Sequence, residues 1–317
     1  MMEITIVIPV YNRERLLPRT LASVVAQTYR PLHVVLVDNG STDATPAVLR
    51  DFEMRQSAPD FRVTVCREPT PGAPAARNAG LRHVTSEWVM FFDSDDEMAP
   101  QLVANYVATI IGNPEADLVY TDVEIVDERG VARVKRSPRK INAHFLCGHI
   151  FHTYLSTQRY VVRRRLLESV GGWDVRLSCW NDWELGIRLL LHTSRLVKAG
   201  AANPLVLVHA HGDSITGNSF SDKVDALLAS VDVAEQTVNA SNRRDKNRLL
   251  NCLVYKKTVL AALCTREGSP RGAQLFAETM QHLASPRLSL LFAAGYRLAC
   301  RGIRGTTRVV ELFLRCH

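Results

Sequence analysis

The first 120 residues alternate between two kinds of hydrophobic pattern. Short, nearly continuous runs of apolar and β-branched residues predict strands that are covered on both faces. Longer segments in which apolar residues recur every three or four positions predict helices between these strands. The expected strands span residues 4–8, 33–37, 61–66 and 88–92, and the expected helices span residues 14–27, 43–55 and 73–83. Repeated strand–helix–strand units predict an α/β fold with a Rossmann-like, mostly parallel, doubly wound sheet flanked by helices.

The pattern changes after residue 117. We expect a strand pair at residues 118–126 and 131–135, followed by a basic, loop-like stretch at residues 137–152. Two helices are expected at residues 164–170 and 181–192, and a further strand at residues 205–209. From about residue 221 the pattern is helical only. We therefore expect one domain, residues 1–218, that contains the sheet, and a separate helical C-terminal subdomain, residues 219–317.

Composition narrows the class of protein. The seven cysteines of the 317 residues are an odd number, widely spaced and without a CxxC pair, which argues against a disulfide framework or a thiolate zinc site and fits a reducing compartment. The start of the sequence lacks the pattern of a secretory signal, and no stretch reaches the roughly 18 apolar residues of a spanning helix. We therefore expect a cytoplasmic protein. The net charge of +7 calls for a polyanionic partner, which can be a nucleotide, a nucleic acid or a membrane surface.

Three carboxylates follow the predicted strand at residues 88–92. Ligands of such sheets bind beyond the carboxyl ends of the strands, where Asp93, Asp95 and Asp96 would stand together. Their mutual repulsion favours a bound hard cation, and Mg²⁺ or Mn²⁺ held by carboxylates and substrate phosphates is usual in phosphate chemistry. The alternative is that these acids cap a helix beginning near residue 99. We favour the cap for Asp96 and the ligand role for Asp93 and Asp95.

Two other strand ends carry polar and aromatic side chains. Tyr11 after the first strand could stack on a base, and Asp38 at the end of the second could accept a base N–H. Ordinary loop and capping chemistry explains residues 40–43 but not Asp38. Arg77, in the third helix, could neutralise phosphate or orient Asp93. The alternative, a surface arginine on an alanine-rich packing helix, is left open.

Later segments add a carboxylate and two histidines. Asp182 stands between Trp180 and Trp183 at a helix start, where a carboxylate could accept the proton of an acceptor hydroxyl and the indoles could pack on a sugar. The alternative makes Asp182 a cap and both tryptophans core residues. His209 and His211 follow a strand in alternating positions, so only one of them is expected to face a site.

Taken together, these segments resemble glycosyltransferase family 2, whose members have the GT-A fold. The resemblance covers roughly residues 4–216 and rests on an ordered set of motifs: TIVIPVYNRE, VVLVDNGSTD, GAPAARNAGL, FFDSDDEM, GGWD, NDWELGIRLL and HGDSIT. It implies an inverting enzyme that takes a sugar from a UDP-sugar or another NDP-sugar with Mg²⁺ or Mn²⁺. The acceptor would be a hydroxyl of a growing glycan or a lipid-linked saccharide, as in polysaccharide biosynthesis.

The resemblance also implies roles for individual residues. The nucleotide-binding set would be Pro9, Tyr11, Asn12, Asp38, Arg77, Asp93, Ser94 and Asp95. Within it, Asp93 and Asp95 form the DxD pair, with Asp93 toward ribose and Asp95 on the metal. Asp182 would be the general base, and His211 would supply a further metal contact. The chain departs from the family where Asn181 replaces a glutamate and where His209 stands in place of a frequent arginine.

Two other functions would require different residues. A nucleotidyltransferase usually has a glycine-rich, basic loop after the first strand, and YNRERLLP is not such a loop. A catalytically silent nucleotide-sugar-binding or scaffold protein would not need Asp95 and Asp182.

Residues 288–317 combine arginines with apolar positions and could form a basic, amphipathic segment on an anionic membrane surface at the inner face of the membrane. The alternative is a helix packed on the catalytic domain or on the partner of a homodimer. Nucleic acid is disfavoured, since the segment has few base-stacking aromatics.

Overall fold

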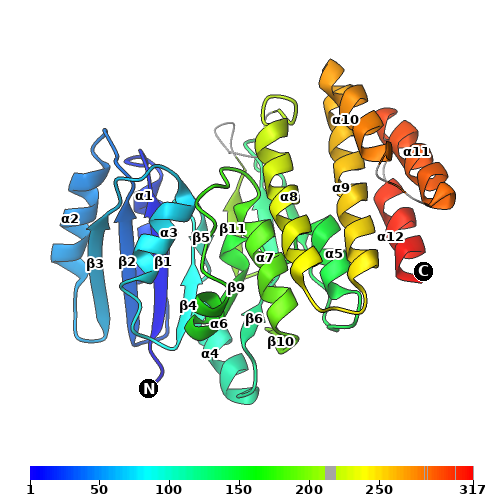
Figure 1. Ribbon diagram of the computed structural model, residues 1–317. Helices are drawn as coiled ribbons and strands as arrows, with labels where there is room; N and C mark the ends of the chain where they lie inside the picture. The colour runs from blue at the N-terminus through cyan, green and yellow to red at the C-terminus, as the bar shows by residue number, and fades with distance from the viewer. Residues whose placement is uncertain (211–218, 282, 284, 304, 317) are drawn as a thin grey trace. The chain divides into compact units, whose positions relative to one another are not determined.

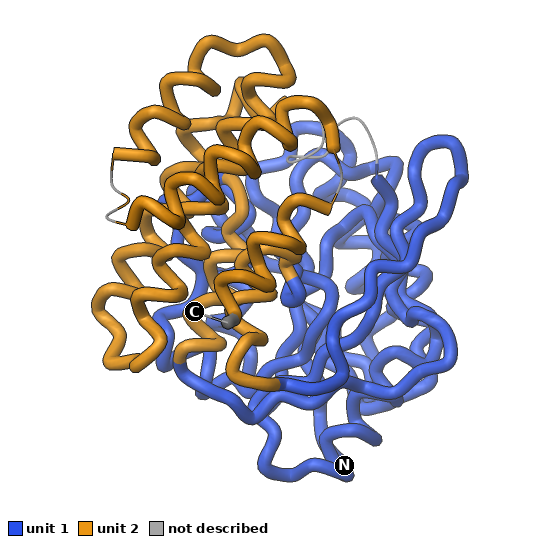
Figure 2. Tube along the Cα trace, turned by 90° about the vertical axis from the view of Figure 1, so that its right-hand side faces the viewer, with its two compact units in different colours: residues 1–141, 154–178, 192–211 blue, residues 142–153, 179–191, 212–317 orange. Residues whose placement is uncertain are grey.

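The computed structural model describes residues 1–210, 219–281, 283, 285–303 and 305–316. These residues form two compact units, coloured separately in Figure 2. Unit 1 comprises residues 1–141, 154–178 and 192–211, and unit 2 comprises residues 142–153, 179–191 and 212–317, in each case apart from the residues not described. The expected division into a catalytic domain, residues 1–218, and a helical subdomain, residues 219–317, stays a prediction.

Unit 1 is built on a seven-stranded sheet in the order β10-β6-β9-β4-β1-β2-β3 (Figure 1). Its strands are β1 Ile4–Val10, β2 Leu32–Asp38, β3 Phe61–Arg67, β4 Trp88–Phe91, β6 Leu118–Tyr120, β9 Tyr160–Arg163 and β10 Leu196–Lys198. β1 pairs in parallel with both β2 and β4, and β2 pairs in parallel with β3. Every residue of β2 and β4 is buried, as expected for strands with both faces covered. The predicted α/β fold with a mostly parallel sheet is confirmed.

The helices of unit 1 lie between its strands along the chain. They are α1 Leu17–Val25, α2 Thr45–Gln56, α3 Ala73–Leu81, α4 Leu102–Gly112 and α6 Arg164–Ser169. α3 packs closely across β1 and β2, because a Cβ atom on Gly80 would lie only 2.3 Å from Cγ1 of Val7. The small residues of this helix therefore allow the close approach that brings its other side chains to the sheet edge.

Three features of unit 1 differ from the expected pattern. The expected strand at residues 118–126 is two strands, because β6 joins the main sheet whereas β7, Val123–Val126, pairs with β8, Ala132–Lys135. These belong to a second, four-stranded sheet in the order β5-β11-β7-β8, with β5 Glu97–Met98 and β11 Val206–His209. The main sheet also contains β9, an antiparallel strand between β4 and β6 that the pattern did not predict.

Unit 2 is helical in its described residues, and α9, Lys246–Arg266, is its central helix. The helices α5 Phe145–His152, α8 Val224–Ala240, α10 Pro270–Gln281, α11 Pro286–Cys300 and α12 Thr306–Cys316 all pack against α9. The expected helical pattern after residue 221 is confirmed. The expectation of a loop over residues 137–152 is wrong where α5 forms. The sequence of this helix shows no clear helical period, and its packing on α9 buries most of its residues.

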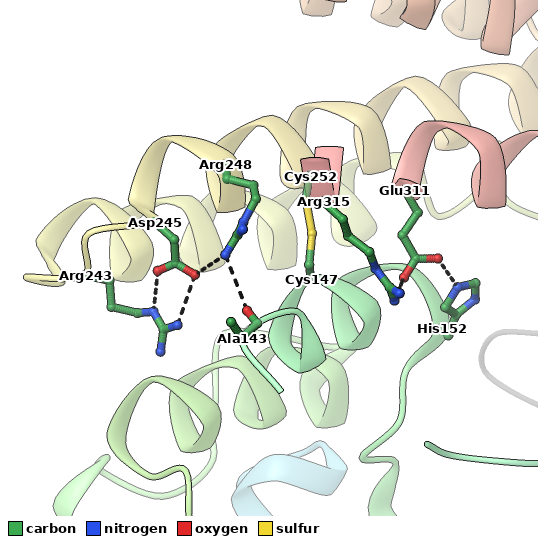
Figure 3. The surroundings of a disulfide bond; sticks show 9 residues. All are labelled: Ala143, Cys147, His152, Arg243, Asp245, Arg248, Cys252, Glu311 and Arg315. Carbon is green, nitrogen blue, oxygen red and sulfur yellow. Dashed lines mark hydrogen bonds and ion pairs between the residues drawn. A yellow bond between two sulfur atoms is a disulfide. The ribbon is translucent and has the colours of Figure 1, made fainter. Parts of the chain in front are cut away.

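A disulfide bond joins Cys147 of α5 to Cys252 of α9 (Figure 3). The number and spacing of the cysteines argued against a disulfide framework and gave no indication of this pair, because its members are 105 residues apart. The cysteines recorded as free in the described part of the chain are Cys66, Cys179, Cys264 and Cys300. No helix among the described residues is long and apolar enough to span a membrane. The cytoplasmic location and the reducing compartment stay predictions.

Candidate functional site

The carboxyl ends of β1, β2 and β4 lie side by side in unit 1. The parallel register sets Val10 opposite Asp38 and Val7 opposite Phe91, so the chain leaves all three strands at one edge of the sheet. The predicted nucleotide-binding residues Pro9, Tyr11, Asn12, Asp38, Asp93, Ser94 and Asp95 all belong to these strand ends or follow them directly. The structure therefore brings the predicted set to one edge, as the sheet topology required.

Hydrogen bonds tie the loop after β1 to the loop after β2. The backbone N–H of Asn12 donates to Oγ of Ser41 at 3.0 Å, and Oδ1 of Asn12 accepts from the backbone N–H of Thr42 at 2.8 Å. Asn12 has a φ of +50°, a conformation that asparagine tolerates better than most residues. Asn12 therefore ties the two loops to each other.

Asp38 and Tyr11 stand on these joined loops. Oδ1 of Asp38 accepts from the backbone N–H of Ser41 at 2.9 Å, and the residue is only 7% exposed. Tyr11, by contrast, is 55% exposed. A fixed carboxylate beside an exposed aromatic ring can offer one hydrogen-bond acceptor and one stacking surface.

Asp93 is held by two donors from different parts of unit 1. Nη2 of Arg77 donates to Oδ1 of Asp93 at 2.7 Å, and Nε2 of Gln158 donates to Oδ2 at 2.7 Å. The Arg77 guanidinium is nearly buried and also lies over the ring of Trp173, 4.4 Å from its centroid. The structure thus makes Arg77 a buried partner of Asp93 rather than a surface residue, which was the alternative left open.

Asp96 is buried behind Asp93. Its carboxylate accepts hydrogen bonds from the side-chain amide of Gln158 and from the backbone N–H of His209, the latter at 2.9 Å. Burial, followed by the charges of Asp93 and Asp95, raises the pKa of Asp96 well above its ordinary value.

The interpretation of Asp96 as a helix cap is wrong. α4 begins at Leu102 with Gln101 in the cap position and no side-chain cap bond, because the short strand β5 intervenes. Asp96 instead anchors the sheet edge to β11 through His209.

Asp95 faces a second group of charges. Its carboxylate lies 3.6 Å from Nε of Arg13, and its backbone carbonyl accepts from Nη2 of Arg19 at 2.8 Å. Arg19 also lies 3.3 Å from Glu97, whose Oε1 is 2.7 Å from Nε2 of His209. The edge of the sheet therefore alternates acidic and basic groups, and its arginines can meet phosphate oxygens as well as carboxylates.

Sequence reasoning did not single out Gln158 and Arg19. Gln158 belongs to the short 3-10 helix η1, Thr157–Arg159, which leads into β9 and so reaches the acids after β4 only because β9 pairs with β4. Arg19 lies on α1 as one of many arginines. Neither position carries a local motif, so only the fold shows its part.

Asp182 belongs to unit 2 and lies in the first turn of α7, Asn181–His192. Its Oδ1 accepts from the backbone N–H of Trp183 at 2.8 Å. Trp183 is a core residue whose Nε1 donates to the carbonyl of Ile150, whereas Trp180 is half-buried with Nζ of Lys256 4.3 Å from its ring centroid. The core alternative therefore describes Trp183 and only in part Trp180, and the role of Asp182 as a base stays a prediction.

The predicted metal ligand His211 lies outside the described residues. Among the residues that the structure does describe, no group of three or more His, Cys, Asp or Glu side chains is arranged to hold a metal ion. Asp93 and Asp95 nevertheless supply carboxylate oxygens, the donors that Mg²⁺ and Mn²⁺ prefer.

The part of the chain that contains these strand ends is similar to known sequences. The sequence model described as "Glycosyl transferase family 2" matches residues 5–170. A "PGL/p-HBAD biosynthesis glycosyltransferase" of Mycobacterium bovis is 32% identical over 189 residues, which cover 58% of this chain and 68% of that protein. The "Glycosyltransferase GlyA" of Streptococcus pneumoniae is 36% identical over 109 residues, which cover 34% of this chain but only 15% of that protein's length.

Solved structures share the fold over nearly the whole chain. The S. aureus protein TarS 1-349 in complex with UDP-GlcNAc superposes with a TM-score of 0.72 at 18% identity and covers 99% of this chain and 92% of that chain. The mannosyltransferase PcManGT from Pyrobaculum calidifontis, in complex with GDP-Man and Mn²⁺, gives a TM-score of 0.59 at 21% identity, covering 98% and 84%, respectively. At these identities the likeness concerns the fold alone.

Proposed function

The chain belongs to glycosyl transferase family 2, and from this premise we propose that it moves a sugar from a nucleoside-diphosphate sugar to an acceptor hydroxyl by a single inverting displacement. The observation that carries the proposal is the shared edge of β1, β2 and β4, where Asp38 stands at the end of β2 and Asp93 and Asp95 follow β4, the two strands that flank β1. Residues 1–218 would carry the chemistry, and residues 219–317 would form the helical subdomain.

The donor would bind through its nucleotide at this edge. Tyr11 would stack on the base, Asp38 would accept a base N–H, and Asn12 would keep their two loops in place with Pro9 before it. Asp93, fixed by Arg77 and Gln158, would face the ribose, with Ser94 next to it. UDP-sugars are the proposed donors, a choice supported by the UDP-GlcNAc bound to TarS, which shares the fold.

A divalent cation, Mg²⁺ or Mn²⁺, would bind at Asp95 with Asp93 and His211 as further ligands. Asp95 fits because carboxylate oxygens are the donors that these ions prefer and because its side chain remains 18% exposed at the sheet edge. The Mn²⁺ in the PcManGT structure supports the choice of metal. When bound, such an ion would offset the negative charge of the departing diphosphate.

The residues of the chain would share the remaining chemistry. Asp182 would accept the proton of the acceptor hydroxyl. At the same time the oxygen of that hydroxyl would bond to the anomeric carbon of the donor sugar, and the bond from that carbon to the diphosphate would break. Arg77 would help to stabilise the negative charge that develops on the leaving group. The acceptor would be a hydroxyl of a growing glycan or of a lipid-linked saccharide. The formation of a homodimer by this chain stays a prediction.

Release of UDP from a panel of UDP-sugars, measured with Mn²⁺ and candidate acceptors, tests the proposal. Asp182→Asn is expected to keep donor binding in a thermal-shift assay but to lose turnover by about 10²–10⁴-fold, since it removes a general base. Asp51→Asn, a change in an exposed pair with Arg55 on α2, is the matched control and should turn over normally. Equal turnover of Asp182→Asn and wild type would refute the base. Neither binding nor turnover with any donor, while another protein copurifies, would favour a silent scaffold.

A further inference from the structure

The outward side of α11 in unit 2 carries apolar and basic side chains. The exposed residues of the helix are Pro286, Arg287, Leu290, Ala294, Arg297 and Leu298, and Arg301, which directly follows the helix, is exposed too. They recur at intervals of three, four and seven positions, which places all of them on one side of the helix. Leu290 is 74% exposed and Leu298 is 38% exposed, so apolar surface on this side remains in contact with water.

The opposite side of α11 is fixed by its packing on α9. The ring of Phe292 lies 4.9 Å from the ring of Tyr255, centroid to centroid. At Gly295 a Cβ atom would lie only 2.7 Å from the hydroxyl oxygen of Tyr255, so the two helices are in close contact. The apolar residues on the outer side of α11 therefore do not pack into the core of unit 2.

α12 has the same division. Val310, Glu311 and Leu314 are buried, whereas Arg308, Val309 and Leu312 are exposed, the last two by 63% and 60%. Glu311 turns inward, where Oε2 lies 2.8 Å from Nε2 of His152 on α5 (Figure 3). The exposed side of this helix thus also points away from the core of unit 2.

α11 and α12 pack against each other, and Figure 1 draws both on the same side of α9. We call their outward sides and the connecting residue Ile303 the α11–α12 surface. Its exposed apolar residues are Leu290, Leu298, Ile303, Val309 and Leu312, and its exposed arginines are Arg287, Arg297, Arg301 and Arg308. The sequence has no aspartate or glutamate between Glu278 and Glu311, and Glu311 is buried, so the helices add no acidic group to this surface.

We propose that the α11–α12 surface docks the protein on an anionic lipid bilayer. Single exposed apolar residues are ordinary, but five of them with four arginines form the combination that an interfacial helix presents to lipid. Arginine can reach headgroup phosphates while its aliphatic stem stays among apolar groups. Charge complementarity therefore selects an anionic lipid as the occupant.

The charge also argues against a second copy of the chain as the occupant. A two-fold symmetric dimer through this surface would set the surface against itself, with arginines facing arginines and no carboxylate to pair with them. Docking on lipid does not depend on the proposed sugar transfer, and its test below does not measure turnover. A lipid-linked acceptor, if used, would lie at the same membrane.

Co-sedimentation of the full chain with vesicles tests the proposal. The probes are vesicles of phosphatidylcholine alone and vesicles of equal parts phosphatidylcholine and phosphatidylglycerol. Wild type is expected to sediment with the anionic vesicles only and to be released by added salt, which screens the arginines.

Two sets of variants separate charge from apolar insertion. Each of Arg287→Gln, Arg297→Gln, Arg301→Gln and Arg308→Gln is expected to weaken binding about five-fold, equivalent to about 1 kcal/mol. Leu290→Gln and Leu312→Gln are each expected to weaken it roughly ten-fold, because the polar side chain no longer enters the apolar layer. All six positions are exposed in water, so the folded protein should unfold at the wild-type temperature.

Matched controls come from unit 1. Met54→Gln and Ile111→Gln change exposed apolar residues, and Arg129→Gln, Arg133→Gln, Arg136→Gln and Arg139→Gln change exposed arginines. These controls should bind the anionic vesicles as wild type does. The proposal is overturned if wild type ignores the anionic vesicles, binds both kinds equally, or is weakened as much by the controls. A dimer in vesicle-free solution that Leu290→Gln dissociates, without vesicle binding, would assign the surface to self-association instead.

Discussion

Gln158 is expected to hold the acidic edge of the sheet together. Its side-chain amide donates to Asp93 and to Asp96, so one neutral residue separates two carboxylates that would otherwise face each other. Gln158→Leu keeps a side chain of similar size and removes both donors. The variant is therefore a direct perturbation of the network rather than of the packing around it.

The size of the effect follows from the exposure of the two acceptors. A hydrogen bond to a charged group contributes about 1.5–3 kcal/mol. Asp93 keeps 29% of its side chain exposed, so water replaces part of its lost bond. Asp96 is only 2% exposed, so its oxygen stays without a substitute for the lost amide. Together we expect Gln158→Leu to lower the free energy of unfolding by about 3 kcal/mol.

Thermal unfolding followed by circular dichroism measures this loss. For 317 residues at about 2.1 cal/mol/K per residue, about 3 kcal/mol corresponds to a fall of roughly 4–5 °C in Tm. Gln101→Leu, at an exposed position that makes no capping bond, is the matched control and should unfold near the wild-type temperature. If Gln158→Leu and Gln101→Leu unfold together, the network does not stabilise the fold as reasoned. Gln158→Glu should be worse than Gln158→Leu, because it adds a third carboxylate to the pair.

Two further predictions concern other parts of unit 1. Gly172→Ala should lower the free energy of unfolding in urea by about 1–3 kcal/mol, because Gly172 has a φ of +70° and a Cβ atom would lie 2.7 Å from Oδ1 of Asn78; an unchanged urea midpoint would contradict this. Burial, with help from Arg62, lowers the pKa of His33 to about 4 from 6.5, so the unfolded chain binds more protons in this range and stability should fall as pH falls from 6.5 toward 4. His33→Gln should lose less stability than wild type between pH 6.5 and pH 4. If urea titrations at these two pH values show equal losses for the variant and wild type, His33 is not the group responsible.

The sequence predicted the parts of the fold in which local pattern and burial agree. β1, β2 and β4 are nearly continuous apolar runs because both of their faces are covered, and their parallel pairing places Asp38, Asp93 and Asp95 at one edge. What local pattern could not give is pairing between distant segments. β9, and with it Gln158, reaches β4 only by antiparallel pairing after a long connection.

The two misinterpreted segments have the same origin. Acids often precede helices, which favours a cap role for Asp96, but the two residues of β5 pair with β11 and move the helix start to Leu102. The basic residues next to α5 predict a loop, yet packing on α9 buries most of this short helix. Tertiary contacts decided both cases.

The central claim is that the acids at the mouth of the parallel sheet gather a nucleoside diphosphate with a divalent cation. Calorimetric titration of UDP in the presence of Mn²⁺ measures this most directly, using wild type, Asp95→Asn and the control Asp51→Asn. Wild type and Asp51→Asn are expected to bind UDP, and Asp95→Asn is expected to bind it at least about ten-fold more weakly, since one carboxylate ligand is lost. UDP binding that is equally tight with Asp95→Asn, or absent from the wild-type protein, would contradict the central claim.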